Sequence, residues 1–189
     1  RPAMQSLAAF LTTSLDGFFA DASGDVSWAH RSDPEWLEFV QGNAGGGGTL
    51  LFGRITYELM IRYWPTLVAK QQNPVVAEGM NSAQKYVFSR TLKEAKWQNT
   101  KLLKSDIAGE VQKLKQQSSK GLCILGSGTI VTQLLEARLI DELQMVVSPI
   151  LLGKGKTPFE TLKQRLPLKL LKTRSFPNGN VIHYYGPAT

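Results

Sequence analysis

Short apolar runs and amphipathic stretches alternate along most of the chain, and each pattern predicts one kind of element. Leu122 to Leu125 is a typical apolar run, which indicates a strand covered on both faces. Asp33, Pro34 and Glu35 indicate a helix start, because an N-cap acid, a first-turn proline and an early carboxylate all favour one. Strands are predicted at residues 6–13, 49–52, 85–88, 100–103, 122–125, 142–147, 168–176 and 181–185. Helices are predicted at about 33–42, 54–63, 106–117 and 128–138.

The order of these elements predicts an α/β fold. Strands and helices alternate through the first part of the chain, which is typical of parallel strands joined by helices. Residues 177–180 (Pro-Asn-Gly-Asn) between the last two strands favour an antiparallel hairpin. We therefore predict three layers, with a central mixed, mostly parallel sheet, helices on both its faces and a C-terminal antiparallel hairpin. A chain of 189 residues forms one domain on this prediction, running from 4 to 189 because three residues precede Met4.

The charge of the chain permits an anionic partner without indicating nucleic acid. The net charge is +7, which is compatible with a phosphorylated cofactor, a nucleic acid or an acidic surface. The densest basic segment, residues 163–174, alternates Lys and Arg with Leu. This pattern predicts an amphipathic strand with a solvated face, so nucleic-acid binding is not favoured.

Neither a membrane span, a disulfide nor a metal site is predicted. No apolar run approaches the roughly 18 residues needed to cross a bilayer. Cys123 is the single cysteine, so it has no internal disulfide partner, and a reducing cytoplasm is the simplest compartment. His30 and His183 stand alone, without the spacing of metal ligands.

A glycine turn follows the apolar run at 122–125. Gly126 and Gly128 allow the backbone to bend and approach a ligand, and Ser127 or Thr129 can cap the helix that follows. Free N–H groups at a helix start favour an anion such as phosphate. Val131 occupies the third glycine position of the dinucleotide pattern G-x-G-x-x-G, so an ordinary tight strand-to-helix turn is the alternative.

Two more predicted strands end in residues that suit a phosphate. Arg54 and Thr56 follow the strand at 49–52, and Ser89 and Arg90 follow the strand at 85–88. Arginine suits phosphate because its guanidinium donates two parallel hydrogen bonds. Ligands of open α/β sheets bind at the carboxyl ends of the strands, where these residues fall. The alternative is that Thr56 only caps a helix and Arg54 is only solvated.

A set of seven motifs in this order covers nearly the whole chain. They are Thr13-Ser-Leu-Asp-Gly17, Ala22-Ser-Gly-Asp-Val-Ser-Trp28, Phe52-Gly-Arg-Ile-Thr-Tyr-Glu58, Phe88-Ser-Arg90, Leu125-Gly-Ser-Gly-Thr129, Ile140-Asp-Glu142 and Pro149-Ile-Leu-Leu-Gly-Lys-Gly155. With them the sequence resembles the dihydrofolate reductase fold, in the branch that contains the reductase domain of bacterial riboflavin biosynthesis.

The resemblance implies a reductase that takes its hydride from NADPH. It places Arg90 at the 2′-phosphate, a position where a cation favours NADPH over NADH. It also implies that Thr13, Asp16 and Gly17 lie beside the nicotinamide, and that the protein forms a homodimer. The residues implied to hold the phosphates are Gly53, Arg54, Thr56, Ser89, Arg90, Gly126, Ser127, Gly128, Thr129 and Ile130.

The implied substrate is a small molecule resembling a pterin or a ribosylaminopyrimidine. Trp28, Asp33 and Trp36 are its predicted contacts, since their spacing is similar to the tryptophan-to-acid spacing of dihydrofolate reductases. Asp33 is the first candidate for the catalytic acid, with a pure N-cap role as its alternative. Asp16 is the second candidate, with a turn residue as its alternative.

Two features depart from the riboflavin branch. The sequence has no Cys and His spacing for the zinc of the deaminase that usually accompanies this reductase. Residues 45–48 are four consecutive glycines in place of an ordinary connection. Apart from these departures, a non-catalytic NADPH-binding protein stays open as an alternative, and a basic nucleic-acid-binding protein, which the positive charge favours, as a weaker one.

Overall fold

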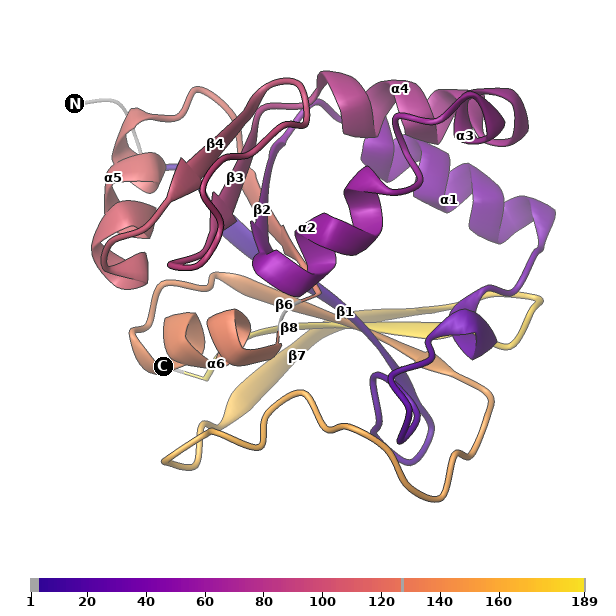
Figure 1. The fold of residues 1–189 in the computed structure, drawn as a ribbon. Coiled ribbons are helices and arrows are strands. Elements are labelled where there is room, and N and C mark those ends of the chain that lie inside the picture. The colour runs from indigo at the N-terminus through magenta and orange to yellow at the C-terminus, as the bar shows by residue number, and fades with distance from the viewer. Residues whose placement is uncertain (1–3, 127, 189) are drawn as a thin grey trace.

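The structure, a computed structural model, describes residues 4–126 and 128–188. Its centre is one eight-stranded sheet (Figure 1). The strands are β1 (Leu7–Ser14), β2 (Thr49–Gly53), β3 (Lys85–Phe88), β4 (Thr100–Leu103), β5 (Leu122–Leu125), β6 (Glu142–Ser148), β7 (Leu168–Ser175) and β8 (Val181–Pro187). The helices are α1 (Pro34–Ala44), α2 (Arg54–Ile61), α3 (Leu67–Gln72), α4 (Pro74–Ser82), α5 (Ile107–Gln117) and α6 (Gly128–Glu136), with a short 3₁₀ helix η1 (Ser27–Ala29).

The sheet is mixed and mostly parallel, which confirms the predicted fold class. Its strand order is β4-β3-β2-β5-β1-β6-β8-β7. Neighbours from β4 through β6 run parallel, while β8 is antiparallel to both β6 and β7. Parallel strands end at the same edge of a sheet, so the turns after β1, β2, β3 and β5 share one edge, called here the carboxyl edge.

Helices cover both faces of the sheet, also as predicted (Figure 1). On one face, α5 and α6 bury residues such as Val111 and Leu134 against alternate residues of β1, β2 and β5, including Leu51. On the other face, α1, α2 and α4 pack on a second cluster around Phe52. Leu51 and Phe52 are consecutive in β2 and point to opposite faces, as the pleat of a strand requires, so both positions must be apolar.

The C-terminal hairpin is joined to α1 by an aromatic cluster. Trp36 meets Phe176 edge to face, with ring centroids 4.8 Å apart, and Phe39 lies 5.2 Å from Phe176. Arg174 stacks over Phe176 and pairs with Glu35 at 3.2 Å. These contacts tie β7 and the start of α1 together.

Strand β7 is exposed along its whole length, on both faces. It is an edge strand paired only with β8, and a bulge interrupts that pairing between Leu170 and Lys172. Leu170 and Leu171 are each about half exposed. The predicted strand is confirmed, but both of its faces are open to solvent rather than one.

Residues 66–82 form two helices that the sequence reasoning did not predict. The Thr66 side chain accepts a hydrogen bond from the Ala69 amide and caps α3, and Pro74 begins α4. Helix α1 continues to Ala44, so the helix stop predicted at Gly42 is wrong. Its packing against α4 extends it, because Gly79 lets the α4 backbone lie directly on the Ala44 carbonyl.

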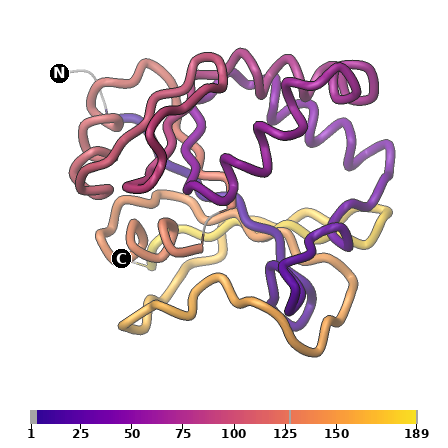
Figure 2. The backbone as a smooth tube through the Cα atoms, viewed as in Figure 1, coloured from indigo at the N-terminus to yellow at the C-terminus, as the bar shows by residue number. Residues whose placement is uncertain are grey.

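Two connections lie side by side at the carboxyl edge. Residues 15–20, the first loop, follow β1, and residues 149–160, the second loop, follow β6. Ala20 and Lys156 form an antiparallel bridge between them. Figure 2 traces the indigo first loop beside the orange second loop.

Candidate functional site

Two of the predicted phosphate turns are in contact at the carboxyl edge. A Cβ built on Gly126 would lie 2.9 Å from Thr56 Oγ1, so the turn after β5 packs directly on the first turn of α2. Gly126 also has a φ of +65°, a conformation that side chains disfavour. Glycine is therefore required at this position, for space and for backbone conformation.

Arg54 and Thr56 occupy the first turn of α2. Gly53 is the N-cap residue of α2, so the alternative in which Thr56 caps this helix is wrong. Arg54 Nη1 donates to both carboxylate oxygens of Glu58, at 3.1 and 3.3 Å. The Arg54 side chain is 43% exposed, which leaves its other N–H groups available to a ligand.

Ser89 and Arg90 follow β3, directly beside the end of β2. The Ser89 hydroxyl accepts hydrogen bonds from the amides of Thr91 and Leu92, so it shapes the turn. Arg90 is exposed and makes no hydrogen bond or ion pair with the residues that the structure describes. The turn thus presents an unpaired guanidinium at the carboxyl edge.

The start of α6 supplies the third turn. Gly128 lies so close to the Pro158 carbonyl that a Cβ would collide with it, which brings the second loop against α6. Thr129 is exposed, while Ile130 is buried in the core, so the Ile130 side chain is not available to a ligand there. The predicted contact at Ser127 lies outside the described residues.

A cavity of about 380 Å³ opens at the carboxyl edge, and Pro158, which lines it, lies against Gly128 at the start of α6. Thr13 and Gly17, both predicted to lie beside a nicotinamide, line one side of it. The opposite side comes from residues that the sequence reasoning missed. These are Met145, Thr157, Pro158, Phe159 and Glu160.

Asp16 is exposed, yet its carboxylate is fully engaged. It accepts hydrogen bonds from the Ser14 hydroxyl at 2.6 Å, the Gly153 amide at 2.8 Å and the Leu152 amide at 3.1 Å. The Ser14 hydroxyl, followed by these amides, lowers the pKa of Asp16 below its ordinary value. A carboxylate held in the ionised form is a poor proton donor, so this geometry disfavours Asp16 as the catalytic acid.

Asp33 and the two tryptophans have clear structural roles. Asp33 Oδ2 accepts the Trp36 amide at 2.9 Å, which confirms Asp33 as the N-cap of α1. Trp36 packs in the aromatic cluster, and Trp28 Nε1 donates to the Asp25 carbonyl. None of the three lines the cavity beside Thr13, and their contacts with substrate stay predictions.

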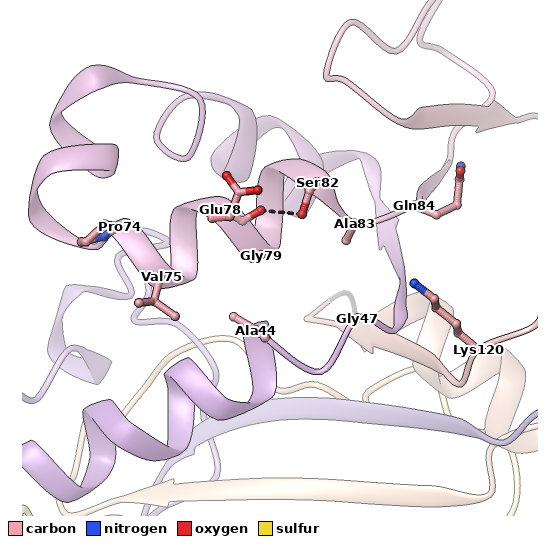
Figure 3. Close-up of a pocket in the computed structure, with 11 residues that line it drawn as sticks. Ala44, Gly47, Pro74, Val75, Glu78, Gly79, Ser82, Ala83, Gln84 and Lys120 are labelled. Carbon is pink, nitrogen blue, oxygen red and sulfur yellow. Dashed lines mark hydrogen bonds between the residues drawn. The ribbon is translucent and has the colours of Figure 1, made fainter.

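A second cavity, of about 540 Å³, lies at the opposite edge of the sheet (Figure 3). It lies between α1 and α4, next to the glycine run at 45–48, and Lys120 points toward it. Its walls are mainly backbone and small apolar side chains, and the Glu78 carboxylate points away from it. It contains none of the predicted site residues, so the carboxyl edge is the candidate site.

The donors at the carboxyl edge suit a dinucleotide. Two arginines, threonine hydroxyls and the amides at the starts of α2 and α6 are groups that bind phosphates. Among residues 4–126 and 128–188, no group of three His, Cys, Asp or Glu side chains is arranged to hold a metal ion. Within the same ranges, every helix is too short or too polar to cross a membrane.

The sheet order, the two helical layers and the glycine turns define a dihydrofolate reductase-like α/β protein. The model of the RibD C-terminal domain matches residues 5–182, and the chain belongs to this family. YyaP of Bacillus subtilis (strain 168) is 32% identical over 177 residues, covering 90% of this chain and 89% of YyaP.

Solved structures share the fold at low sequence identity. A pyrimidine reductase-like protein from Corynebacterium diphtheriae aligns with a TM-score of 0.67 and 14% identity, over 98% of this chain and 92% of that one. A diaminohydroxyphosphoribosylaminopyrimidine deaminase/5-amino-6-(5-phosphoribosylamino)uracil reductase from Thermotoga maritima aligns with a TM-score of 0.70 and 17% identity. That alignment covers 98% of this chain but 57% of the Thermotoga protein.

Proposed function

We propose that the protein is an NADPH-dependent reductase of a small pterin- or ribosylaminopyrimidine-like molecule. The observation that carries this proposal is the placement of three turns at one edge, namely the strand-to-helix turns after β2 and β5 and the turn after β3, with a cavity lined by Thr13 and Gly17 at the same edge. Membership of the RibD C-terminal domain family supports the same reaction class. When bound, NADPH supplies the hydride.

The chain's own residues then bind and orient. Arg54 and Arg90 hold phosphates, and Arg90, which lacks a described protein partner, takes the 2′-phosphate that distinguishes NADPH from NADH. The first and second loops form the walls that position the substrate ring against the nicotinamide and exclude water. Most of the catalytic effect on this proposal comes from positioning.

Proton delivery falls to one of two carboxylates. Glu160 is the acidic residue that lines the cavity, and it was not among the residues predicted from the sequence. Asp33 is the acid predicted from the sequence, and one of its oxygens is committed to the N-cap. If Glu160 is the acid, Glu160→Gln should lower turnover with NADPH affinity unchanged and Asp33→Asn should not, whereas the reverse result assigns the proton to Asp33.

The test is NADPH oxidation measured against dihydrofolate, other pterins and ribosylaminopyrimidines. Oxidation with one member of the panel supports the reductase. Saturable NADPH binding without oxidation of any member supports the non-catalytic alternative. Absence of NADPH binding contradicts both.

We also propose that the protein acts as a homodimer through β7 in the cytoplasm. The strand leaves a free hydrogen-bonding edge and exposed leucines, which is a template for pairing with a second copy. Leu170→Lys should shift the sedimentation of the protein from dimer to monomer, while Leu151→Lys, at an exposed loop position, should not. Wild-type protein sedimenting as a monomer contradicts the proposal.

A further inference from the structure

We infer that Asp16 is a positioning residue whose carboxylate holds the first loop and the second loop together as the two walls of the cavity. The effect of Asp16 on turnover rests on the proposed function. The bridging of the two loops by Asp16 does not, because it concerns contacts within the chain alone. Asp16 on this inference neither gives nor takes a proton.

The carboxylate bridges two segments that are far apart in sequence. Close in sequence, the Ser14 hydroxyl donates to the Asp16 carboxylate and itself accepts a hydrogen bond from the Phe18 amide at 2.9 Å. Its donors on the far side are the amides of Leu152 and Gly153, more than 130 residues away in the chain. Oδ1 accepts from the Ser14 hydroxyl and the Leu152 amide, and Oδ2 accepts from the Leu152 and Gly153 amides, so the charge is shared between the two loops.

The line of contacts between the first loop and the second loop, called here the seam, continues beyond Asp16 through backbone hydrogen bonds. The Leu15 amide donates to the Ile150 carbonyl at 2.9 Å, next to the carboxylate. At the other end, in the short antiparallel bridge, the Phe19 amide donates to the Lys156 carbonyl at 2.9 Å, and the Lys156 amide donates to the Ala20 carbonyl at 3.0 Å. These backbone bonds align the loops, and the Asp16 carboxylate is the side chain that crosses between them at the turn.

Glycines make this close approach feasible. A Cβ on Gly155 would collide with the Ala20 carbonyl, so only glycine allows the second loop to lie against the first there. Gly153 has a φ of +78°, which aims its amide at Asp16 in a conformation that favours glycine. The second loop is therefore shaped to be held from the first.

The seam sets the geometry of the cavity. Gly17 lies next to Asp16 in sequence and lines one wall, while residues 157–160 continue directly from the seam and line the other. Opening the seam at Asp16 therefore changes the distance between Gly17 and Glu160. A shift of this size across a binding cavity lowers turnover even when no reacting group is removed.

Asp16→Asn is the sharpest perturbation of these contacts. The neutral amide keeps one acceptor oxygen and replaces the other with an N–H₂ donor, so it loses the charge and cannot accept at both positions that now receive the Ser14 hydroxyl and the amides of Leu152 and Gly153. The matched control is Asp21→Asn. Asp21 is likewise a carboxylate with lowered pKa, but the donors to it, among them Ser23 and Asp25, lie within its own connection.

Hydrogen exchange without any ligand tests the structural part. Asp16→Asn should speed exchange of the Leu152 and Gly153 amides by roughly tenfold or more, which corresponds to about 1.4 kcal/mol. Asp21→Asn should leave both unchanged. Unchanged exchange of these amides in Asp16→Asn overturns the inference, whatever the protein binds.

The wild-type protein provides a second measurement if Asp16→Asn fails to fold. In an acid titration followed by NMR, the amides of Leu152 and Gly153 should shift together, with the low midpoint of the Asp16 carboxylate. Amides that do not follow this carboxylate overturn the inference.

Turnover distinguishes positioning from acid catalysis. With a substrate from the panel, Asp16→Asn should lower kcat/KM at least tenfold, leave NADPH affinity within about twofold and keep the pH profile of the wild type. Loss of the limb along which wild-type activity falls as pH rises assigns the proton to Asp16 and overturns the positioning role. Failure of the whole panel counts against the proposed function and leaves the exchange result as the test of Asp16.

Discussion

Lys85→Met should destabilise the protein by an amount that depends on pH. Lys85 begins β3 and is fully buried, and its ammonium donates to the carbonyls of Met80, Asn81 and Ala83 at 2.8 to 2.9 Å. Two of these carbonyls belong to the last turns of α4, where a helix has no internal partners for them. The ammonium also lies 4.4 Å from the centre of the Trp97 ring.

The magnitude follows from two opposing effects. Methionine fills a similar volume but leaves three buried acceptors unpaired, at about 1–2 kcal/mol each. Burial lowers the pKa of Lys85 from 10.5 to about 8, so removing the charge returns ~3 kcal/mol at pH 7. The net loss in the free energy of unfolding at pH 7 is therefore about 0–3 kcal/mol.

The sign of the pH dependence is fixed by the lowered pKa. Between pH 8 and 10.5 the unfolded chain holds the Lys85 proton that the folded chain has released. The unfolded state thus binds more protons, and the stability contributed by Lys85 rises with pH. The deficit of Lys85→Met relative to wild type should grow by about 2 kcal/mol from pH 8 to pH 10.

Urea unfolding followed by circular dichroism at pH 7, 8, 9 and 10 measures this difference. Lys101→Met is the control, since Lys101 is an exposed lysine on the neighbouring strand β4, and it should stay within about 0.5 kcal/mol of wild type throughout. Other groups titrate alike in wild type and variant, so they cancel in the difference. A deficit that stays constant with pH refutes the lowered pKa, and no deficit refutes the capping role.

Three further predictions concern the glycines and the cofactor edge. Arg90→Ala should weaken NADPH binding by roughly 10- to 100-fold and NADH binding little, as measured by fluorescence titration, and Arg62→Ala, beyond the far end of α2, should change neither. Equal losses for both cofactors contradict contact between Arg90 and the 2′-phosphate. Gly126→Ala should lower the free energy of unfolding by ~1–3 kcal/mol, because the methyl group strains a positive φ and meets Thr56. Gly42→Ala, inside α1 with open space around the new methyl group, should instead raise it by about 0.5–1 kcal/mol, and the opposite sign in urea unfolding contradicts that assignment.

The sequence predicts where the strands lie along the chain better than it predicts which strands pair with one another. An apolar run such as 122–125 specifies a buried strand locally, whereas its place between β1 and β2 depends on pairings such as Leu51 with Ile124, over 70 residues apart. Helices α3 and α4 are short, and tertiary contacts rather than a long apolar period stabilise them. The burial of Lys85 also depends on tertiary contacts, because the carbonyls that permit it come from α4.

Some residues of the candidate site could be predicted from the sequence and others could not, and the difference has a physical cause. Arg54 and Arg90 could be placed at the carboxyl edge because each follows its own strand directly, so local sequence determines where it lies. Glu160 reaches the cavity only through the seam of loops, and that seam is made largely of backbone amides and carbonyls, which every residue possesses. The Asp16 side chain crosses this seam, but its partners on the second loop are again backbone amides. The Asp-Gly pair therefore predicts a turn and gives no sign that Asp16 connects the two loops. For residues that act through backbone partners, a sequence pattern can thus predict where the residue lies but not which contacts it makes.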